Sequence, residues 1–312
     1  MTPGPTLVIG AGGLVGRHLC AALEASGHPV HRARVPWAEG GLARGALDST
    51  VSSFAEAAQG TAWTVAWCAG AGVVATSAEA LEEELAVFRH TLRVIEAASL
   101  HLADGVLVLA SSAGGLYAGS AEPPFTEDTE PVPLVPYGHT KLAMERDLRD
   151  LSRRTGVRSV VARLANVYGP GQRLDKPQGL ISQLALAHAS GRPLPIYVSM
   201  DTIRDYVYAA DCGAMLAAAA ARARSTPPGT ATTKIIASGR PVTIGHLLGE
   251  ARRVFHRPLR TIPVGGAGTG QVLDLRLRSL VMHEIDPLAA TPLAAGLDRT
   301  ARDVADRVVA RP

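Results

Sequence analysis

The chain has 312 residues, 47% of them hydrophobic, which suits one large globular domain or two coupled ones. Its 31 basic and 28 acidic residues leave a formal charge of +3 without a polybasic block, which argues against nucleic acid or an anionic membrane surface as partners. No apolar run approaches the length of a membrane span and the start lacks the pattern of a signal peptide, so a cytoplasmic protein is expected.

Short apolar runs alternate with helical patterns along the first half of the chain. The strand-like runs are TLVIG at 6–10, HPVHRARV at 28–35, TVAWCAG at 64–70, GVLVLASS at 105–112 and RSVVARLANV at 158–167. The helix candidates lie between them, at 13–26, 49–59, 79–99 and 138–154. Such alternation is typical of β-α-β crossovers, which build a parallel sheet covered on both faces. The sequence therefore predicts an α/β fold with a Rossmann-type, doubly wound parallel sheet.

After about residue 170 the pattern becomes less regular. Pro and Gly interrupt it repeatedly, and shorter helices are predicted, for example at 209–222 and 243–255. We expect a smaller, irregular C-terminal substrate-binding domain made of residues 171–203 and 239–312. Residues 1–170 and 204–238 would then form the dinucleotide-binding domain.

A glycine-rich turn joins the first predicted strand to the first predicted helix. In GAGGLVG, Gly10, Gly13 and Gly16 have the spacing G-x-x-G-x-x-G. Residues without a Cβ let the backbone approach a pyrophosphate and aim its N–H groups and the helix dipole at it. The turn therefore predicts a dinucleotide site. A turn that binds nothing is the alternative, which the strand before it and the helix after it disfavour.

The end of the second strand bears on which nicotinamide cofactor is bound. An acidic side chain there binds the ribose 2′-hydroxyl of NAD, but HRARV supplies Arg32 and Arg34, whose guanidinium groups can hold the 2′-phosphate of NADP. Otherwise these arginines are the solvated ends of an edge segment. NADP is the expected cofactor and NAD the alternative. Asp48, after an expected third strand, either meets the adenine amino group or caps the helix at 49–59.

Tyr137 and Lys141 in YGHTK stand four residues apart in a predicted helix, so their side chains share one face. A free tyrosine, with a pKa of about 10, is a poor base at neutral pH, but a nearby ammonium group favours the phenolate. Taken alone, the spacing fits either an acid–base pair or two surface residues. The wider sequence has to decide between them.

Several further segments accompany this pair. SSAGGLY at 111–117 follows a buried strand, and PPFTEDTEPVPLVPYGHTKLAME, RLANVYGPGQ and RDYVYAADC come later in that order. Together with GAGGLVG they resemble the sequence blocks of the extended short-chain dehydrogenase/reductases, the family of NAD-dependent nucleotide-sugar epimerases, dehydratases and 4-ketoreductases. The resemblance runs through the chain from end to end.

The resemblance implies three catalytic residues. Tyr137 is expected to be the acid/base, and Lys141 to favour its phenolate and hold the nicotinamide ribose. The family has a Ser or Thr four residues before the tyrosine that ends SSAGGLY, and this chain has Ala113 there. Ser112 is therefore expected to polarise the substrate C–O bond, unless it only turns the strand end. Ser111 is expected to bind substrate beside it.

Two glycines narrow the reaction class. Dehydrating members of the family place an Asp-Glu pair just after the hydroxyl residue and decarboxylating members keep a glutamate there, whereas this chain has Gly114 and Gly115. The resemblance therefore implies carbonyl reduction, alcohol oxidation or epimerisation. A second departure is the family's asparagine in the helix after the fourth strand, which is replaced within LAVFRHT at 85–91.

Two polar residues are expected on the substrate side. The resemblance places Asn166 of RLANVYGPG at the diphosphate of a nucleotide-sugar, and Arg204 of IRDYVY can hold a phosphate by a bidentate contact. The alternatives are a turn-forming role for Asn166 and a salt bridge from Arg204 to Asp205. The expected partners are a nucleotide-sugar and a second copy of the chain, in a homodimer formed through the helices at 79–99 and 138–154.

The expected function is an NADP-dependent oxidoreductase that reduces a keto group on a nucleotide-linked (deoxy)sugar. The nicotinamide would supply the hydride and Tyr137 the proton. A nucleotide-sugar 4-epimerase with tightly bound NAD is the alternative, and a non-enzymatic NADP-binding sensor is a third reading. Cys20, Cys68 and Cys212 lie far apart without metal-ligand spacing, so no metal site is expected.

Overall fold

The computed structural model describes residues 4–37, 39–70, 76–98, 100–175, 179–256, 259–264 and 272–309. A parallel sheet in the order β10-β5-β4-β3-β1-β2 forms its centre. Its strands are β1 (Thr6–Ile9), β2 (Val30–Arg32), β3 (Trp63–Trp67), β4 (Gly105–Ser112), β5 (Arg158–Leu164) and β10 (Ala231–Ile236). Every residue of β3 is buried, because helices cover both faces of the sheet. The predicted parallel α/β fold is confirmed.

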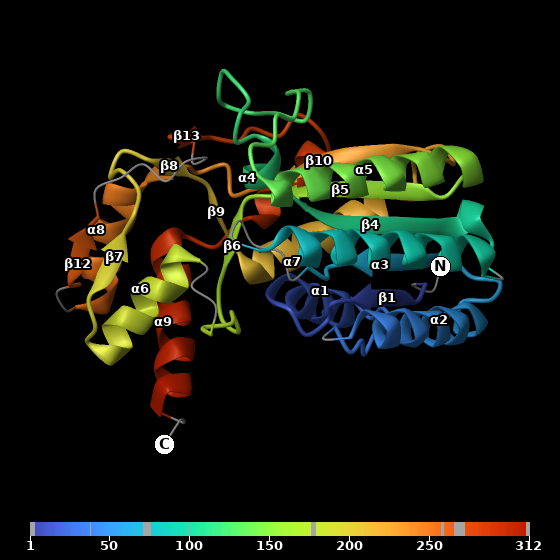
Figure 1. Ribbon diagram of the computed structural model, residues 1–312, viewed down its shortest axis with the longest axis horizontal. Helices are drawn as coiled ribbons and strands as arrows, with labels where there is room; N and C mark the ends of the chain where they lie inside the picture. Colours follow the sequence, from blue (N-terminus) through green and yellow to red (C-terminus); the bar gives the residue numbers. More distant parts are fainter. Residues whose placement is uncertain are drawn as a thin grey trace.

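Long helices cover the two faces of this sheet (Figure 1). They are α1 (Leu14–Ala25), α2 (Gly40–Ala57), α3 (Ala78–Ala97), α5 (Pro136–Thr155) and α7 (Ala209–Ala223). Alternate residues of β1 serve opposite faces: Leu7 and Ile9 pack with α2, α3 and α5, while Val8 packs with α1 and α7. No helix in the described part of the chain is long and apolar enough to cross a membrane.

A second, less regular part lies at the end of the sheet where α4 follows β4 (Figure 1). Its short strands form the small sheets β11-β8-β13, β12-β7 and β6-β9, and it has an apolar core of its own. The remaining elements are η1 (Leu102–Asp104), α4 (Ala113–Leu116), β6 (Asn166–Tyr168), α6 (Leu180–Ser190), β7 (Leu194–Ile196), β8 (Ile203–Arg204), β9 (Tyr206–Tyr208), β11 (Val242–Thr243), α8 (Ile244–Phe255), β12 (Thr261–Pro263), β13 (Asp274–Leu275), η2 (His283–Leu288) and α9 (Leu293–Val309). The division into two domains by residue number stays a prediction.

The expected third strand before Asp48 is wrong for the described residues, because α2 occupies this stretch. Leu47, Val51 and Phe54 recur at helical spacing and are buried against the sheet. Burial of this stripe favours one long helix that begins at Gly40. Asp48 consequently lies inside a helix, and its expected role as the cap of a helix at 49–59 is wrong.

The strand expected at 158–167 is two strands. Residues up to Leu164 form β5 in the central sheet, whereas β6 begins at Asn166 and pairs with β9. The chain therefore leaves the central sheet at Ala165 and enters the second part directly. This change of partner places Asn166 at the junction of the two parts.

Candidate active site

The glycine turn after β1 has no room for side chains at two positions. Gly10 has a φ of +89°, and a Cβ there would lie 2.5 Å from the backbone nitrogen of Ala69. A Cβ on Gly16 would lie 2.2 Å from the carbonyl oxygen of Gly10. Gly13 precedes α1, and no side chain in the described residues caps this helix end, so amides of its first turn are available to a ligand. The cradle fits the pyrophosphate of a dinucleotide.

Arg17 adds a positive charge beside this turn. Its Nη2 donates to the carbonyl oxygen of Gly12 at 3.0 Å. A Cβ on Gly171 would lie only 2.3 Å from Nη1 of Arg17, so the guanidinium also lies against the loop after β6. Arg17 is not among the site residues predicted from the sequence. Its position directly after the third glycine of the turn could have indicated a basic side chain near the bound pyrophosphate.

The residues expected to bind the adenosine end already have other neighbours. Arg32, at the end of β2, forms an ion pair with Glu24 of α1, with 2.7 Å between Nη2 and Oε1. Arg34 is exposed and makes no hydrogen bond or ion pair with the described residues. Oδ1 of Asp48 lies 2.6 Å from Nε2 of His90 on α3. The contacts of Arg32 and Arg34 with a 2′-phosphate, and of Asp48 with adenine, stay predictions.

Tyr137 and Lys141 lie on the first two turns of α5, which begins at Pro136. Proline suits the first position of a helix, where its missing N–H leaves no partner unsatisfied. Nζ of Lys141 is 5.7 Å from the centroid of the Tyr137 ring. The structure therefore brings these two predicted catalytic side chains together on one helix face.

Lys141 is buried and forms an ion pair with Glu84 of α3, with 3.0 Å between Nζ and Oε1. Burial by itself lowers the pKa of Lys141, but Tyr137 and Glu84 outweigh it, so the pKa is raised and the lysine carries its charge at neutral pH. Glu84 is not among the site residues predicted from the sequence. It stands 57 positions before Lys141 among other glutamates of a helix, so no local pattern distinguished it.

Ser112 is the N-cap of α4, and its Oγ accepts a hydrogen bond from the amide of Gly115 at 3.1 Å. A Cβ on Gly115 would lie 3.0 Å from Cε1 of Tyr137, so the ring of Tyr137 packs on this same glycine. Because Oγ is the acceptor in the cap, the hydroxyl proton of Ser112 can be donated to a ligand. Ala113, which stands at the family's usual hydroxyl position, is fully buried. The catalytic role of Ser112 stays a prediction.

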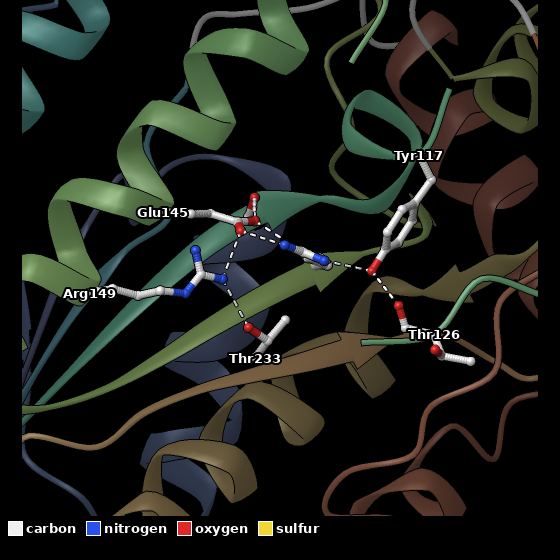
Figure 2. A network of polar contacts seen from close by, with 7 residues as sticks. Tyr117, Thr126, Glu145, Arg149 and Thr233 are labelled. Atoms are coloured by element: carbon white, nitrogen blue, oxygen red, sulfur yellow. Dashed lines mark hydrogen bonds and ion pairs between the residues drawn. The ribbon is translucent and has the colours of Figure 1, made fainter. Parts of the chain in front are cut away.

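Ser111 faces a buried polar network, part of which Figure 2 shows around Glu145. The hydroxyl of Ser111 donates to Oε1 of Glu145 at 2.6 Å. Oε2 of Glu145 also accepts from Arg163 at 2.8 Å and from Arg149 at 3.0 Å. Ser111 and Glu145 are both buried, so a contact of Ser111 with substrate would break a buried hydrogen bond. Its expected substrate role stays a prediction, and the structure holds the side chain in the framework.

The other end of the network fixes Tyr117 (Figure 2). Nη1 of Arg163 donates to the hydroxyl of Tyr117 at 2.7 Å, and this hydroxyl donates to the carbonyl oxygen of Thr126 at 2.7 Å. The ring stacks on Phe125, with 5.3 Å between centroids. Burial raises the pKa of Tyr117, and Arg163 opposes that rise. Tyr117 is thus a buried, neutral framework residue.

Asn166 begins β6, where its backbone N–H and its side-chain Nδ2 both donate to the carbonyl oxygen of Asp205, at 3.1 and 3.0 Å. The residue is exposed beside this strand pair. The alternative of a turn-forming asparagine is wrong, because Asn166 lies in a strand. Its contact with a diphosphate stays a prediction.

Arg204 lies on β8 and is partly buried, and its Nη1 donates to the carbonyl oxygen of Ile203 at 2.8 Å. The alternative of a salt bridge to Asp205 is wrong, because Asp205 instead accepts from the amide of Ser238 at 2.7 Å. Burial lowers the pKa of Arg204. Within the described residues its guanidinium has no ion-pair partner, so it can gain from an anion that reaches it. The phosphate contact stays a prediction.

The sequence pattern of the NAD dependent epimerase/dehydratase family matches residues 6–274. The chain belongs to this family. The match includes the glycine turn, the short helix with Ser112 and the pair of Tyr137 and Lys141. The resemblance expected from the motifs is thereby confirmed.

The curated relatives align over part of their length. The dTDP-4-dehydro-6-deoxyglucose reductase of Escherichia coli is 35% identical over 105 residues, which are 34% of this chain and 33% of the relative. The dTDP-L-rhamnose 4-epimerase of Burkholderia thailandensis is 32% identical over 130 residues, which are 38% of this chain and 36% of the relative. In both cases the chain spans about a third of the relative, so activity does not transfer directly.

Solved structures match over nearly the whole chain. MoeE5 in complex with UDP-glucose and NAD has a TM-score of 0.79 and 24% identity, and the match covers 98% of this chain and 100% of that one. At 24% sequence identity, this structural similarity establishes the fold. Among the other matched structures, some hold NAD and another holds NADPH, so they do not choose between the two dinucleotides.

Proposed function

We propose that the protein is an NADP-dependent oxidoreductase that reduces a keto group on a nucleotide-linked deoxysugar. The observation that carries the proposal is that Tyr137 lies beside Lys141 and packs on Gly115, whose amide donates to Ser112 at the carboxyl end of β4. This set offers a proton donor, a fixed positive charge and a hydrogen-bond donor. Gly114 and Gly115 place no carboxylate on α4, which favours simple carbonyl reduction over dehydration.

A bound nicotinamide would supply the hydride. Tyr137 gives its phenolic proton to the carbonyl oxygen while the carbon receives the hydride, so the ketone becomes an alcohol. Ser112 donates a hydrogen bond to the same oxygen and stabilises the negative charge that develops there. The ammonium group of Lys141 stabilises the phenolate form of Tyr137 that remains after the proton is transferred.

The remaining proposed contacts concern the two nucleotides and the assembly. Arg204 and Asn166 would hold the diphosphate of the sugar nucleotide. The guanidinium group of Arg204 has no ion-pair partner among the described residues, so a phosphate group would supply one. Arg32 and Arg34 would hold the 2′-phosphate of NADP. Two copies would pair through α3 and α5, which pack beside each other on one face of the sheet.

The rival function is a nucleotide-sugar 4-epimerase that keeps NAD bound. The ion pair of Arg32 with Glu24 favours it, because a guanidinium that is already neutralised has less to gain from a 2′-phosphate. An epimerase would oxidise and re-reduce one carbon with the same tyrosine. It would therefore show no net consumption of the dinucleotide.

The test is to incubate the protein with NADPH and a panel of 4-keto-6-deoxyhexose nucleotides, and to follow NADPH oxidation at its absorbance band. Tyr137→Phe is expected to lower kcat by about 10²-fold or more, because the proton donor is lost. Tyr197→Phe is the matched control. Because Tyr197 is 58% exposed, this substitution should leave kcat unchanged. Equal turnover by wild type and Tyr137→Phe would overturn the proposal, as would no reduction of any member of the panel.

A further inference from the structure

We propose that Glu84 is a positioning residue that fixes Lys141 and limits the effect of its charge on Tyr137, so that Tyr137 starts the reaction as a neutral proton donor. The inference rests on the proposed function, in which Tyr137 protonates a ketone. It assigns a role to a side chain that lies outside every motif of the sequence. The family's asparagine in this helix is replaced within 85–91, and Glu84 stands directly before that stretch.

The pair is enclosed by three elements. The side chains of Lys141 and Glu84 are 4% and 8% exposed, and 3.0 Å separates Nζ from Oε1. Gly70, after β3, closes the third side, because a Cβ there would lie 3.4 Å from each of these two atoms. The neighbouring Ala69 packs against Gly10 of the glycine turn, so the pair lies close to the expected path of the dinucleotide.

Glu84 is the anion that faces the lysine. Described groups near Nζ also include the ring of Tyr137, the thiol of Cys68 and the sulfur of Met144 at 3.8 Å. Burial raises the pKa of the Cys68 thiol to about 12, so this group is neutral at physiological pH. Among the described residues around Nζ, Glu84 is therefore the group that balances the charge of Lys141.

This balance has a chemical consequence for a reductase. An ammonium group with no counter-ion in a buried site would draw the nearby phenol toward phenolate, and a phenolate has no proton to give. A carboxylate 3.0 Å from the same ammonium group reduces this stabilisation of the phenolate. Lys141 can still stabilise the phenolate once the proton has left. The geometry thus suits proton donation by Tyr137 at neutral pH.

The experiment follows the ionisation of the phenol itself and needs neither substrate nor dinucleotide. The phenolate absorbance of the ligand-free protein is titrated from neutral to alkaline pH. Subtracting the Tyr137→Phe curve isolates Tyr137 from the other five of the chain's six tyrosines. The same subtraction is made for Glu84→Gln and Glu84→Gln with Tyr137→Phe. Glutamine keeps the shape of the side chain, so the variant removes mainly the charge.

Glu84→Gln is expected to move the ionisation of Tyr137 to lower pH by about one pH unit, because an unbalanced ammonium favours the phenolate. Glu82→Gln is the matched control: it removes a negative charge from an exposed position on the same helix and should leave the curve in place. Curves for Glu84→Gln and wild type that superimpose would overturn the proposal.

A second neutral variant, Glu84→Ser, is expected to give the same shift if the glutamine variant does not fold. Circular dichroism is recorded for each protein. Loss of the fold in both variants would also overturn the proposal, because the side chain would then be needed for folding and not for positioning. Since the titration contains no substrate, its outcome does not depend on whether NADPH oxidation is found, and the two proposals can fail separately.

Discussion

Asp205 is a buried carboxyl group whose hydrogen-bonding capacity is only partly used. The residue is fully buried, its Oδ1 accepts from the amide of Ser238 at 2.7 Å, and its Oδ2 has no hydrogen-bond partner in the described part of the chain. Burial raises the pKa of Asp205, and the amides of Ser238, Gly239 and Arg240 oppose that rise only in part. The fold therefore favours the protonated form of this side chain.

We expect Asp205→Asn to raise the free energy of unfolding near neutral pH. A carboxyl group with a raised pKa stabilises the fold fully below its unfolded-state pKa of about 3.9, and this stabilisation is lost as pH rises through the folded-state pKa. Each unit between the two pKa values corresponds to about 1.4 kcal/mol. Asparagine keeps an oxygen for the amide of Ser238 and carries no charge.

Urea unfolding of both proteins at a series of pH values between about 4 and 8 checks this prediction. The urea concentration at the unfolding midpoint should be higher for Asp205→Asn than for wild type, and this difference should increase with pH. Asp201→Asn is the control, because Asp201 is exposed and close in sequence. A difference that stays constant over the whole range would show that the ionisation of Asp205 does not affect stability.

At the scale of elements, the contact between α4 and α5 sets the position of Tyr137. The ring packs on Gly115, and the Cα of Gly138 on α5 also lies within contact distance of a Cβ placed on Gly115. Conversely, a Cβ on Gly138 would lie 2.1 Å from the carbonyl oxygen of Gly115. The two helices approach this closely because both carry glycine at the contact.

Gly115→Ala is expected to lower kcat about tenfold while the dissociation constant for NADPH changes less than twofold. The added Cβ would lie 3.0 and 3.1 Å from two ring carbons of Tyr137, so the ring must shift, and small displacements of a catalytic group reduce the rate strongly. Gly114→Ala is the matched control on the same helix, because its Cβ would make an ordinary 3.4 Å contact with Leu275. Equal kcat values for the two alanine variants would contradict this role of the contact.

Local patterns sufficed for the features that lie within one turn or one helix. The glycine turn and the pair of Tyr137 and Lys141 needed only spacing and context. The ion pair of Glu84 with Lys141 could not be foreseen, because it joins two helices far apart in sequence. Ser111 was expected to bind substrate beside Ser112; adjacent residues of a strand face opposite sides, and the hydrogen bond of Ser111 to Glu145 depends on how α5 packs on β4. The helix predicted at 49–59 covers only the second half of α2, because the glycines at the start of α2 weaken the helical pattern there.

At the scale of the whole molecule, a parallel sheet supplies the glycine turn, Ser112 and the neighbouring α5, while the second part supplies Arg204. The chain passes between the two parts at Ala165, so residues of both parts lie near the strand ends (Figure 1). This arrangement is typical of sites in which a dinucleotide lies across the strand ends and a second ligand binds opposite it. The central claim is that such a site here uses NADP to reduce a sugar ketone.

The most direct test of this claim has two steps. One sample of the freshly purified protein is denatured, and any dinucleotide that it releases is identified by mass. A second, native sample from which the dinucleotide has been removed is then titrated with NADPH and NADH. A reductase that exchanges its cofactor is expected to release less than stoichiometric dinucleotide and to bind NADPH at least tenfold more tightly than NADH, through Arg32 and Arg34. Stoichiometric NAD or NADH carried through purification, with no preference for NADPH, would contradict the account and favour the 4-epimerase.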